Sequence, residues 1–409
     1  MVGYSTMREV ALWVQTNGKT EVQFRFCETE TDNCRMSRKM MTEENCAFSS
    51  EVIIDSLYPG KNYSYELFLD GKKVEIPWKL QFQTQALWQF RTDPPAFKVA
   101  LGSCLYVNET EFDRPGKSYG GDYQILESIL GKSPDVMVWL GDNTYTRDAD
   151  FDSHFGIYHR YSHTRSLKEL QPFLGSVHQY AIWDDHDYGP NDSDRGYYLK
   201  DVTREAFNCF WANPTAGLNG AGITSKFQWA DMDFFLMDDR WFRSPNERKT
   251  GERTMIGAEQ FQWLIDNLKY SRAPFKFVCI GTQVLNTAKK YETWENLFPE
   301  ERASLLKAIK NEKIEGVFFL TGDRHHSELS KWKDDEGPVV YDLTVSPLTA
   351  TAHDASTESN SLRIEGTHVG ERNFAVLEFS GPQKAREMKI NMYDSNGKEI
   401  WTKTLKPGE

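Results

Sequence analysis

Side chains that bind metals and move protons follow four of the apolar segments in this chain. The acidic ones are Asp142, Asp185, Asp187 and Asp323, and the others are Cys104, Tyr145, His186 and His325. If these groups meet at one edge of a sheet, their negative charges repel one another unless cations lie between them. A carboxylate that bridges two metal ions is usual in two-metal hydrolases, where the metals hold the attacking and leaving oxygens. The pattern therefore predicts a metal cluster with hydrolytic chemistry.

The segment from Val136 to Leu140 is the element around which the others are arranged. It has no polar alternation, which is typical of a strand buried on both faces of a sheet. Gly141 then allows the backbone to turn, and Asp142 stands at the carboxyl end of the strand. In α/β sheets, ligands and metals bind at this end. A single Gly-Asp pair is a weak motif, but two later strands end in the same way, before Asp185 and before Asp323.

Length, charge and cysteine spacing limit the possible classes of protein. A chain of 409 residues exceeds what one hydrophobic core usually supports, so two domains are expected. The formal net charge of -12 argues against a nucleic-acid backbone or an anionic membrane as the main partner. No apolar run is long enough to span a bilayer, and the amino terminus lacks the pattern of a signal peptide. The cysteines show no zinc-finger spacing and no disulfide framework, so free thiols are the default, with one bridge possible among Cys27, Cys34 and Cys46.

Residues 1–92 are predicted to form a small β-sandwich domain. Short alternating segments lie at 9–14, 22–26, 52–55 and 63–69. Pro-Gly and Asp-Gly turns separate some of them, as is typical of antiparallel sandwiches. The stretch from Ser56 to Gly71 resembles the end of a fibronectin type III-like domain. Pro94 and Pro95 then make a stiff connection, which places the boundary to a second domain at 97–409.

The second domain is predicted to alternate strands with helices. Predicted strands lie at 98–101, 136–140, 179–183, 233–238, 275–281 and 316–321. Predicted helices lie at 124–130, 152–174, 258–269 and 299–311. This alternation indicates an α/β layered domain. Further strand-like segments at 339–345, 374–380 and 386–393 indicate that antiparallel pairs complete the sheet.

Four short blocks, taken in order, resemble those of a known family. They are Gly-Ser-Cys at Gly102–Cys104, GD-x-x-Y at Gly141–Tyr145, DDHD at Asp184–Asp187 and GDRHH at Gly322–His326. Together they look like the blocks of the PhoD-type alkaline phosphatases in the calcineurin-like metallophosphoesterase superfamily. The resemblance implies an α/β fold, namely a layered αββα-type sandwich, preceded by the small all-β, fibronectin type III-like domain. A cysteine in the first block, where most metallophosphoesterases have Asp-x-His, is the departure found in the PhoD type.

The resemblance also implies two metal sites. Fe³⁺ would be held by Cys104, Asp142, Tyr145 and His325. Thiolate and phenolate donors suit this trivalent ion. The second site would share Asp142 as a bridging ligand and add Asp185 and Asp323. Ligation by oxygen alone suits a hard cation, so Ca²⁺ or another divalent metal is expected there.

The other predicted site residues act on the substrate. His186 is predicted to be the general acid that protonates the leaving alkoxide, with Asp187 orienting its imidazole and raising its pKa. The alternatives are that His186 is itself a metal ligand or only a hydrogen-bonded loop residue. Arg324, between two proposed ligands, and Arg240 are expected beside the reacting phosphate. The predicted substrate-binding residues are Arg240, Arg243 and His326, and the alternative for Arg243 is a salt bridge with a nearby acid.

These observations favour a metal-dependent phosphoesterase, similar to alkaline phosphatase D, that hydrolyses phosphomonoesters, phosphodiesters or both by metal-activated hydroxide. The alternative is a non-catalytic surface protein that binds phosphate or carbohydrate and has structural metal loops. We expect a small-molecule or polymeric phosphate ester as substrate, no specific nucleic-acid binding, and a monomer. The resemblance implies a periplasmic, cell-surface or secreted location. The loops at 106–122 and 186–198 are expected to line the substrate pocket.

Overall fold

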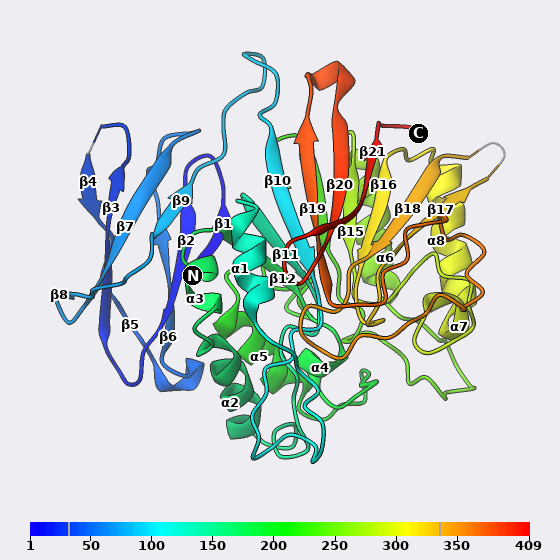
Figure 1. Ribbon diagram of the computed structural model, residues 1–409, viewed down its shortest axis with the longest axis horizontal. Helices are drawn as coiled ribbons and strands as arrows, with labels where there is room; N and C mark the ends of the chain where they lie inside the picture. The colour runs from blue at the N-terminus through cyan, green and yellow to red at the C-terminus, as the bar shows by residue number, and fades with distance from the viewer. Residues whose placement is uncertain (32, 335–336) are drawn as a thin grey trace.

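The three-dimensional structure is a computed structural model that describes residues 1–31, 33–334 and 337–409. The described residues form three β-sheets (Figure 1). The largest contains, in spatial order, β21 (Glu399–Leu405), β20 (Glu387–Asp394), β19 (Asn373–Ser380), β10 (Phe97–Gly102), β11 (Val136–Leu140), β12 (His178–Ile182), β1 (Val2–Ser5), β2 (Val10–Gln15) and β6 (Ser49–Ile54). The second contains β13 (Ser225–Trp229), β14 (Met232–Leu236), β15 (Lys276–Cys279), β16 (Val317–Thr321), β18 (Val339–Thr344) and β17 (Glu328–Lys333). The third contains β4 (Cys34–Met36), β3 (Glu21–Glu28), β7 (Asn62–Leu69) and β8 (Lys72–Lys73), with β5 (Met40–Met41) beside β3 and β9 (Gln81–Gln83) beside β7.

Helices cover the outer faces of the first two sheets (Figure 1). On the side of the largest sheet lie α1 (Gln124–Gly131), α2 (His154–Arg165), α3 (Leu170–Leu174), α4 (Asp185–Tyr188) and α5 (Lys200–Phe210). On the side of the second sheet lie α6 (Ala258–Tyr270), α7 (Trp294–Leu297) and α8 (Pro299–Asn311). Two 3₁₀ helices span Glu44–Cys46 and Gln383–Ala385. None of the helices in the described ranges is long and apolar enough to cross a membrane.

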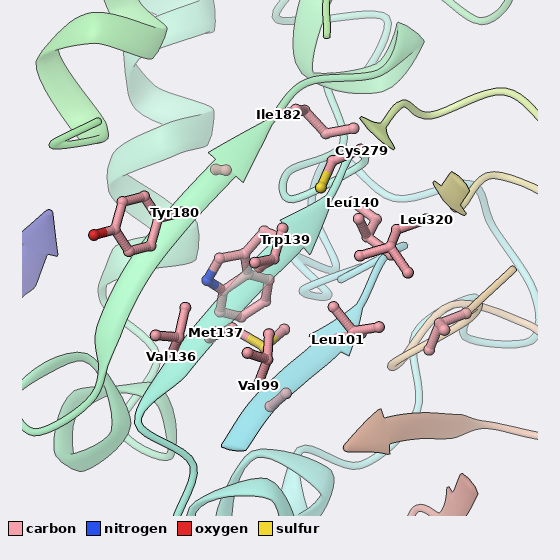
Figure 2. Close-up of a cluster of buried hydrophobic side chains, with 14 of the residues drawn as sticks. Val99, Leu101, Val136, Met137, Trp139, Leu140, Tyr180, Ile182, Cys279 and Leu320 are labelled. Carbon is pink, nitrogen blue, oxygen red and sulfur yellow. The ribbon is translucent and has the colours of Figure 1, made fainter. Parts of the chain in front are cut away.

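The two larger sheets face each other across one apolar core. Along β15, Phe277 and Cys279 belong to the cluster shared with the largest sheet, whereas Val278 packs with the cluster of α6 and α8. This alternation is what a strand buried on both faces requires. Figure 2 shows Cys279 and Leu320 of the second sheet next to Leu140 of the largest one. The predicted αββα layering is therefore confirmed.

The parallel strands of both sheets end at one edge of the molecule. In the largest sheet, β10, β11 and β12 are parallel, and Gly102 pairs with Trp139 near their carboxyl ends. In the second sheet, β14, β15, β16 and β18 are parallel, and Thr321 pairs with Thr344. The loops that follow gather at the lower edge in Figure 1, where α4 lies. Carboxyl ends of parallel strands are where α/β folds place their ligands.

The amino-terminal segment is all-β, as predicted, and has two layers. β1, β2 and β6 face β3 and β7 across a buried cluster that includes Leu12 and Phe24. β1 also pairs in parallel with β12, so one of the two layers continues the largest sheet. The division into separate domains at 1–92 and 97–409 therefore stays a prediction.

The default expectation of free thiols is wrong for four cysteines, although one of the two bridges is among the pairings that the sequence left possible. Disulfides join Cys27 to Cys34 and Cys46 to Cys209. The second bridge links the amino-terminal segment to α5 across a sequence separation of 163. Cysteine spacing cannot reveal a pairing between such distant segments. The two cysteines without a disulfide, Cys104 and Cys279, are both buried.

A buried histidine connects β12 to the amino-terminal strands and predicts a dependence of stability on pH. His178 Nδ1 lies 2.8 Å from the Gly3 carbonyl oxygen, and Nε2 accepts from the Gln83 N–H at 3.2 Å. Burial lowers the pKa of His178 to about 4. The unfolded chain therefore binds one proton more between about pH 4 and 6.5, and stability is lost as the pH falls through this window. At about 1.4 kcal/mol for each pH unit, the loss is roughly 3 kcal/mol.

The His178→Gln variant tests this dependence, because glutamine can donate to one carbonyl and accept from one N–H but does not titrate. We expect the difference in unfolding free energy between pH 7 and pH 4.5, measured with urea, to shrink by roughly 2–3 kcal/mol in this variant. His154→Gln, at an exposed histidine, is the control and should keep the wild-type dependence. An unchanged dependence in His178→Gln would assign the effect to other groups.

Candidate metal centre

Four of the predicted ligands adopt a left-handed backbone conformation. Their φ angles are 60° at Cys104, 52° at Asp142, 64° at Asp323 and 55° at His325. Such conformations are uncommon for residues other than glycine and cost about 1–3 kcal/mol each, so they persist only where the surrounding structure holds them. Their concentration at one edge of the sheets is typical of a functional site.

The first group of donors combines a thiol, a carboxylate, an imidazole and a phenol. The ligating atoms of Cys104, Asp142 and His325 lie within 4.8 Å of one another, and Cys104 Sγ is 3.6 Å from Asp142 Oδ2. Tyr145 Oη lies 3.2 Å from His325 Nε2. His325 Nδ1 lies 2.7 Å from the Thr351 carbonyl oxygen, and donating there leaves Nε2 available to a metal. The four donors fit a metal that accepts sulfur, nitrogen and oxygen ligands.

The second group consists mainly of carboxylates. Asp184, Asp185 and Asp323 offer oxygen atoms within 4.8 Å of one another, and Asp142, Asp185 and His186 form another such cluster. Asp185 belongs to both clusters and so connects the second group to Asp142 of the first. Asp184 Oδ2 is buried and has no hydrogen-bond partner among the described residues. This set of oxygen atoms fits a hard cation.

Burial and mutual repulsion disfavour the ionised forms of these donors. Burial raises the pKa of Cys104 to about 11. It also raises the pKa of Asp323 to about 7, and the carboxylates of Asp185 and Glu292 add to this rise. The pKa of Asp142 is raised well above its usual range, first by burial and then by the charge of Asp185. A cation among these groups would favour their deprotonated forms and remove the penalty.

A cavity of about 510 Å³ opens over both groups. Its lining includes Asp142, Asp185, His186, Asp323, Arg324, His325 and His326. Arg324 Nη1 donates to Gln283 Oε1 at 2.6 Å, and Nη2 donates to both carboxylate oxygens of Glu358. His326 Nδ1 lies 2.9 Å from the carbonyl oxygen of Arg324. The structure thus brings both residues to the site, while their action on a substrate stays a prediction.

Asp187 has a different role from the one predicted. Its Oδ1 accepts hydrogen bonds from the backbone N–H groups of Asn143 and Thr144 at 3.0 and 3.1 Å. Its Oδ2 accepts from the N–H of Asp184 at 3.0 Å, which caps α4. Among the described residues, no hydrogen bond joins it to the His186 ring. The prediction that Asp187 orients the imidazole is therefore wrong, because its carboxylate fixes the loop after β11 to the start of α4.

The His186 ring lies at the cavity wall and packs against Tyr145, with ring centroids 4.3 Å apart. The pKa of His186 is lowered, first by burial, whereas the sequence predicted a rise. The charge that opposes this lowering belongs to Asp185 and not to Asp187. Since His186 also clusters with Asp142 and Asp185, the alternative that it binds a metal stays open.

The clamp predicted for Arg240 and Arg243 does not match their surroundings. The Arg240 side chain has no exposed surface, and its Nε donates to Asp184 Oδ1 at 2.6 Å. Its Nη2 lies 2.8 Å from Glu292 Oε2. Arg243 is equally buried and is paired with the same Glu292, which is the salt-bridge alternative. In this structure neither arginine lines the cavity, and Arg240 balances the charge of the second group.

Three further acidic residues at the site could bind a metal and were not predicted as ligands from the sequence. Asp184 has a signal, since it begins the DDHD block, whereas Asp192 and Glu292, which cluster with Asp185, lie outside the helices and strands and follow no motif. Two glycines make room for Asp184. At Gly141, with φ 89°, a Cβ atom would lie 2.6 Å from Asp184 Cβ, and at Gly281 it would lie 2.4 Å from Asp184 Oδ2.

Two facing sheets with this set of donors at one edge define a fold and site of the metallophosphoesterase type. The chain belongs to the PhoD-like phosphatase family, whose model matches residues 103–384. A curated relative, alkaline phosphatase D from Bacillus subtilis (strain 168), is 22% identical over an alignment of 337 residues that covers 70% of this chain. The match covers 55% of that relative, so this chain corresponds to about half of its length.

Solved structures support the same fold. A structure of PhoD aligns with 99% of this chain and 88% of its own, with a TM-score of 0.79 and 17% identity. A purple acid phosphatase from yellow lupin (Lupinus luteus) seeds aligns with 99% of this chain and 73% of its own, with a TM-score of 0.73 and 11% identity. At these identities the likeness concerns the fold alone.

Proposed function

We propose that this protein is a metal-dependent phosphoesterase that hydrolyses phosphomonoesters, phosphodiesters or both. The proposal rests on two adjacent groups of metal-ligating side chains below an open cavity. Several of these residues have left-handed backbone conformations. Metal ions bound there would polarise the phosphoryl oxygens and supply a hydroxide nucleophile at neutral pH. Membership of the PhoD-like phosphatase family supports this function. A protein that only binds phosphate or carbohydrate would have no use for two such groups.

The chemistry of the donors suggests which metals they hold. For Fe³⁺ we propose Cys104, Asp142, Tyr145 and His325 as ligands. For Ca²⁺ or another divalent metal we propose Asp142 as the bridge, with Asp185 and Asp323. Thiolate and phenolate favour the first ion, and carboxylates favour the second. Among the residues that face the cavity, Arg324 and His326 are proposed to bind the phosphoryl oxygens.

For His186 we propose the role of general acid. Hydrolysis forms a bond from phosphorus to the oxygen of water and breaks the bond to the leaving oxygen, which keeps the electron pair and takes a proton. A ring nitrogen of His186, at the cavity wall, would hold that proton. We expect His186→Ala to keep its metal and to lose roughly 10²–10⁴-fold in rate on esters of basic alcohols, while p-nitrophenyl esters are spared.

The leaving-group series distinguishes this role from metal ligation. The metal content of His186→Ala is measured together with kcat for each ester. If His186 is a metal ligand, His186→Ala should lose activity equally on both kinds of ester and should also lose metal. Equal losses on both kinds of ester, or loss of metal, would rule out the role of general acid.

The location and partners are also proposals. Disulfides form and persist mainly in oxidising compartments, so the Cys27–Cys34 and Cys46–Cys209 bridges support a periplasmic, cell-surface or secreted protein. We propose a monomer that acts on small or polymeric phosphate esters, without specific nucleic-acid binding. The overall negative charge supports the absence of nucleic-acid binding.

The test of the function is hydrolysis of p-nitrophenyl phosphate and bis(p-nitrophenyl) phosphate by the full chain. We expect turnover of at least one ester, loss of turnover after chelation, and recovery when metal is added back. A protein that contains metal but hydrolyses neither ester would support the non-catalytic alternative.

A further inference from the structure

A second cavity, of about 420 Å³, adjoins the cavity over the two donor groups. Tyr119, His186 and Asn191 line both of them, so the two cavities lie next to each other. The remaining lining comes from Pro190, from residues 106–117, which follow β10, and from residues 145–151, which follow β11. Part of the lining thus comes from the two loops that the sequence predicts for the substrate pocket.

Aromatic rings make up much of the second cavity. They belong to Tyr106, Phe112, Tyr119, Tyr145 and Phe151. The Tyr106 ring packs against Tyr119 and Tyr145, with centroid distances of 4.9 and 5.0 Å. Phe112 and Tyr119 remain 41% and 37% exposed. Exposed aromatic rings beside a reactive site offer a flat apolar surface to a ring of the ligand.

The charges of the lining favour an anion. Arg147 is paired with Asp113 at 2.8 Å and lies 4.0 Å above the Tyr106 ring, so these two charges balance. Arg114 and Lys117 are exposed, and neither forms an ion pair or a side-chain hydrogen bond within the part of the chain that the structure describes. Asp148 is the remaining carboxylate of the lining. The wall therefore has a net positive charge, although the whole chain has a net charge of -12.

We propose that this second cavity is the leaving-group site, and that it selects phosphate esters whose leaving group has both an aromatic ring and an additional negative charge. The inference rests on the phosphoesterase function proposed above. The phosphoryl group would lie over the donor groups, and the ring would pack against Phe112 and Tyr119. Arg114 and Lys117 would bind the additional charge.

The position of His186 supports this orientation of the substrate, with the phosphoryl group in the first cavity and the leaving group in the second. It stands where the two cavities meet. With the phosphoryl group over the donor groups and the ring in the second cavity, the oxygen that joins them would lie beside this residue. The same geometry explains why positive charge is placed locally, because a protein with net negative charge repels anionic substrates at long range.

Two chromogenic phosphodiesters test the site. They are methyl 4-nitrophenyl phosphate and methyl 3-carboxy-4-nitrophenyl phosphate, which differ by one carboxylate on the leaving ring. At low ionic strength, we expect the full chain with metal bound to have a kcat/KM for the carboxylated ester roughly fivefold or more above that for the other. The ratio should fall as salt is added, since these cations are exposed.

The Arg114→Ala/Lys117→Ala variant should bring this ratio close to one. The matched control is Arg8→Ala/Lys79→Ala, which removes the same charge at two exposed residues that line neither cavity. The control should keep the wild-type ratio. As a check on the ring, 3-hydroxybenzoate should inhibit more strongly than 3-hydroxycyclohexanecarboxylate, and equal inhibition would refute the aromatic requirement.

The outcomes distinguish failure of the phosphoesterase function from failure of the leaving-group site. If the wild-type protein hydrolyses neither of these diesters nor p-nitrophenyl phosphate, the phosphoesterase function itself fails. If it hydrolyses p-nitrophenyl phosphate alone, the same ratio is measured with the monoesters 4-nitrophenyl phosphate and 3-carboxy-4-nitrophenyl phosphate. If it hydrolyses both esters of the pair with equal kcat/KM, or if the ratio survives in Arg114→Ala/Lys117→Ala, the leaving-group site is wrong and the phosphoesterase function stands.

Discussion

Asp142→Asn is expected to lower kcat/KM for phosphate esters by about 10³-fold or more, because a charged ligand shared by two cations supplies several kcal/mol of transition-state stabilisation. Asp142 belongs to both donor groups, since it clusters with Cys104 and His325 and also with Asp185. The variant should also lose bound metal. Asparagine tolerates the positive φ of this position, so the fold should be retained and the loss can be assigned to the charge.

Activity and metal content of Asp142→Asn are measured together, with circular dichroism to confirm folding. Asp201→Asn, at an exposed aspartate on α5, removes the same charge away from the site and should match the wild type. Wild-type turnover and metal content in Asp142→Asn would contradict the assignment of this residue as the bridging ligand.

Arg240→Met is expected to destabilise the protein by about 3–5 kcal/mol, because it leaves buried carboxylates without their cation. The guanidinium contacts Asp184 and Glu292, and none of its surface is exposed. The free energy of unfolding in urea, measured on metal-free protein, gives the effect without a contribution from metal binding. Arg248→Met, at an exposed arginine, should change it little.

The same variant separates the structural role of Arg240 from the predicted clamp. A clamp on the phosphoryl group would raise KM or lower kcat/KM and leave the free energy of unfolding unchanged. That result would mean that Arg240 moves into the cavity when substrate binds. Loss of stability is what the buried ion pairs predict.

The sheets and the main candidate ligands could be predicted because their signals are local. The apolar run from Val136 to Leu140 is β11 itself, and the residues that follow it include Asp142. Asp185 and Asp323 were predicted in the same way, because each follows the end of an apolar strand segment. A strand buried on both faces has a distinctive composition, and parallel strands must bring their carboxyl ends to one edge.

The contacts that the sequence did not predict are formed between distant segments. Arg240 looks like a phosphate clamp until its partner Glu292, which no motif marks, is known. Asp187 stands beside His186 in the sequence, yet its carboxylate binds backbone groups of the loop after β11. The pairing of β1 with β12 and the Cys46–Cys209 bridge likewise join segments that are far apart in the chain.

Metal-dependent ester hydrolysis is tested most directly by the metal content of protein whose specific activities on p-nitrophenyl phosphate and bis(p-nitrophenyl) phosphate are known. We expect iron and a second metal in stoichiometric amounts, with turnover that disappears on chelation and returns when both are restored. Thiolate and tyrosinate ligands to Fe³⁺ should also give a visible charge-transfer band that Cys104→Ala shifts or removes. Full turnover in metal-free protein would contradict metal-dependent hydrolysis, and unchanged colour and iron content in Cys104→Ala would contradict iron binding by this cysteine.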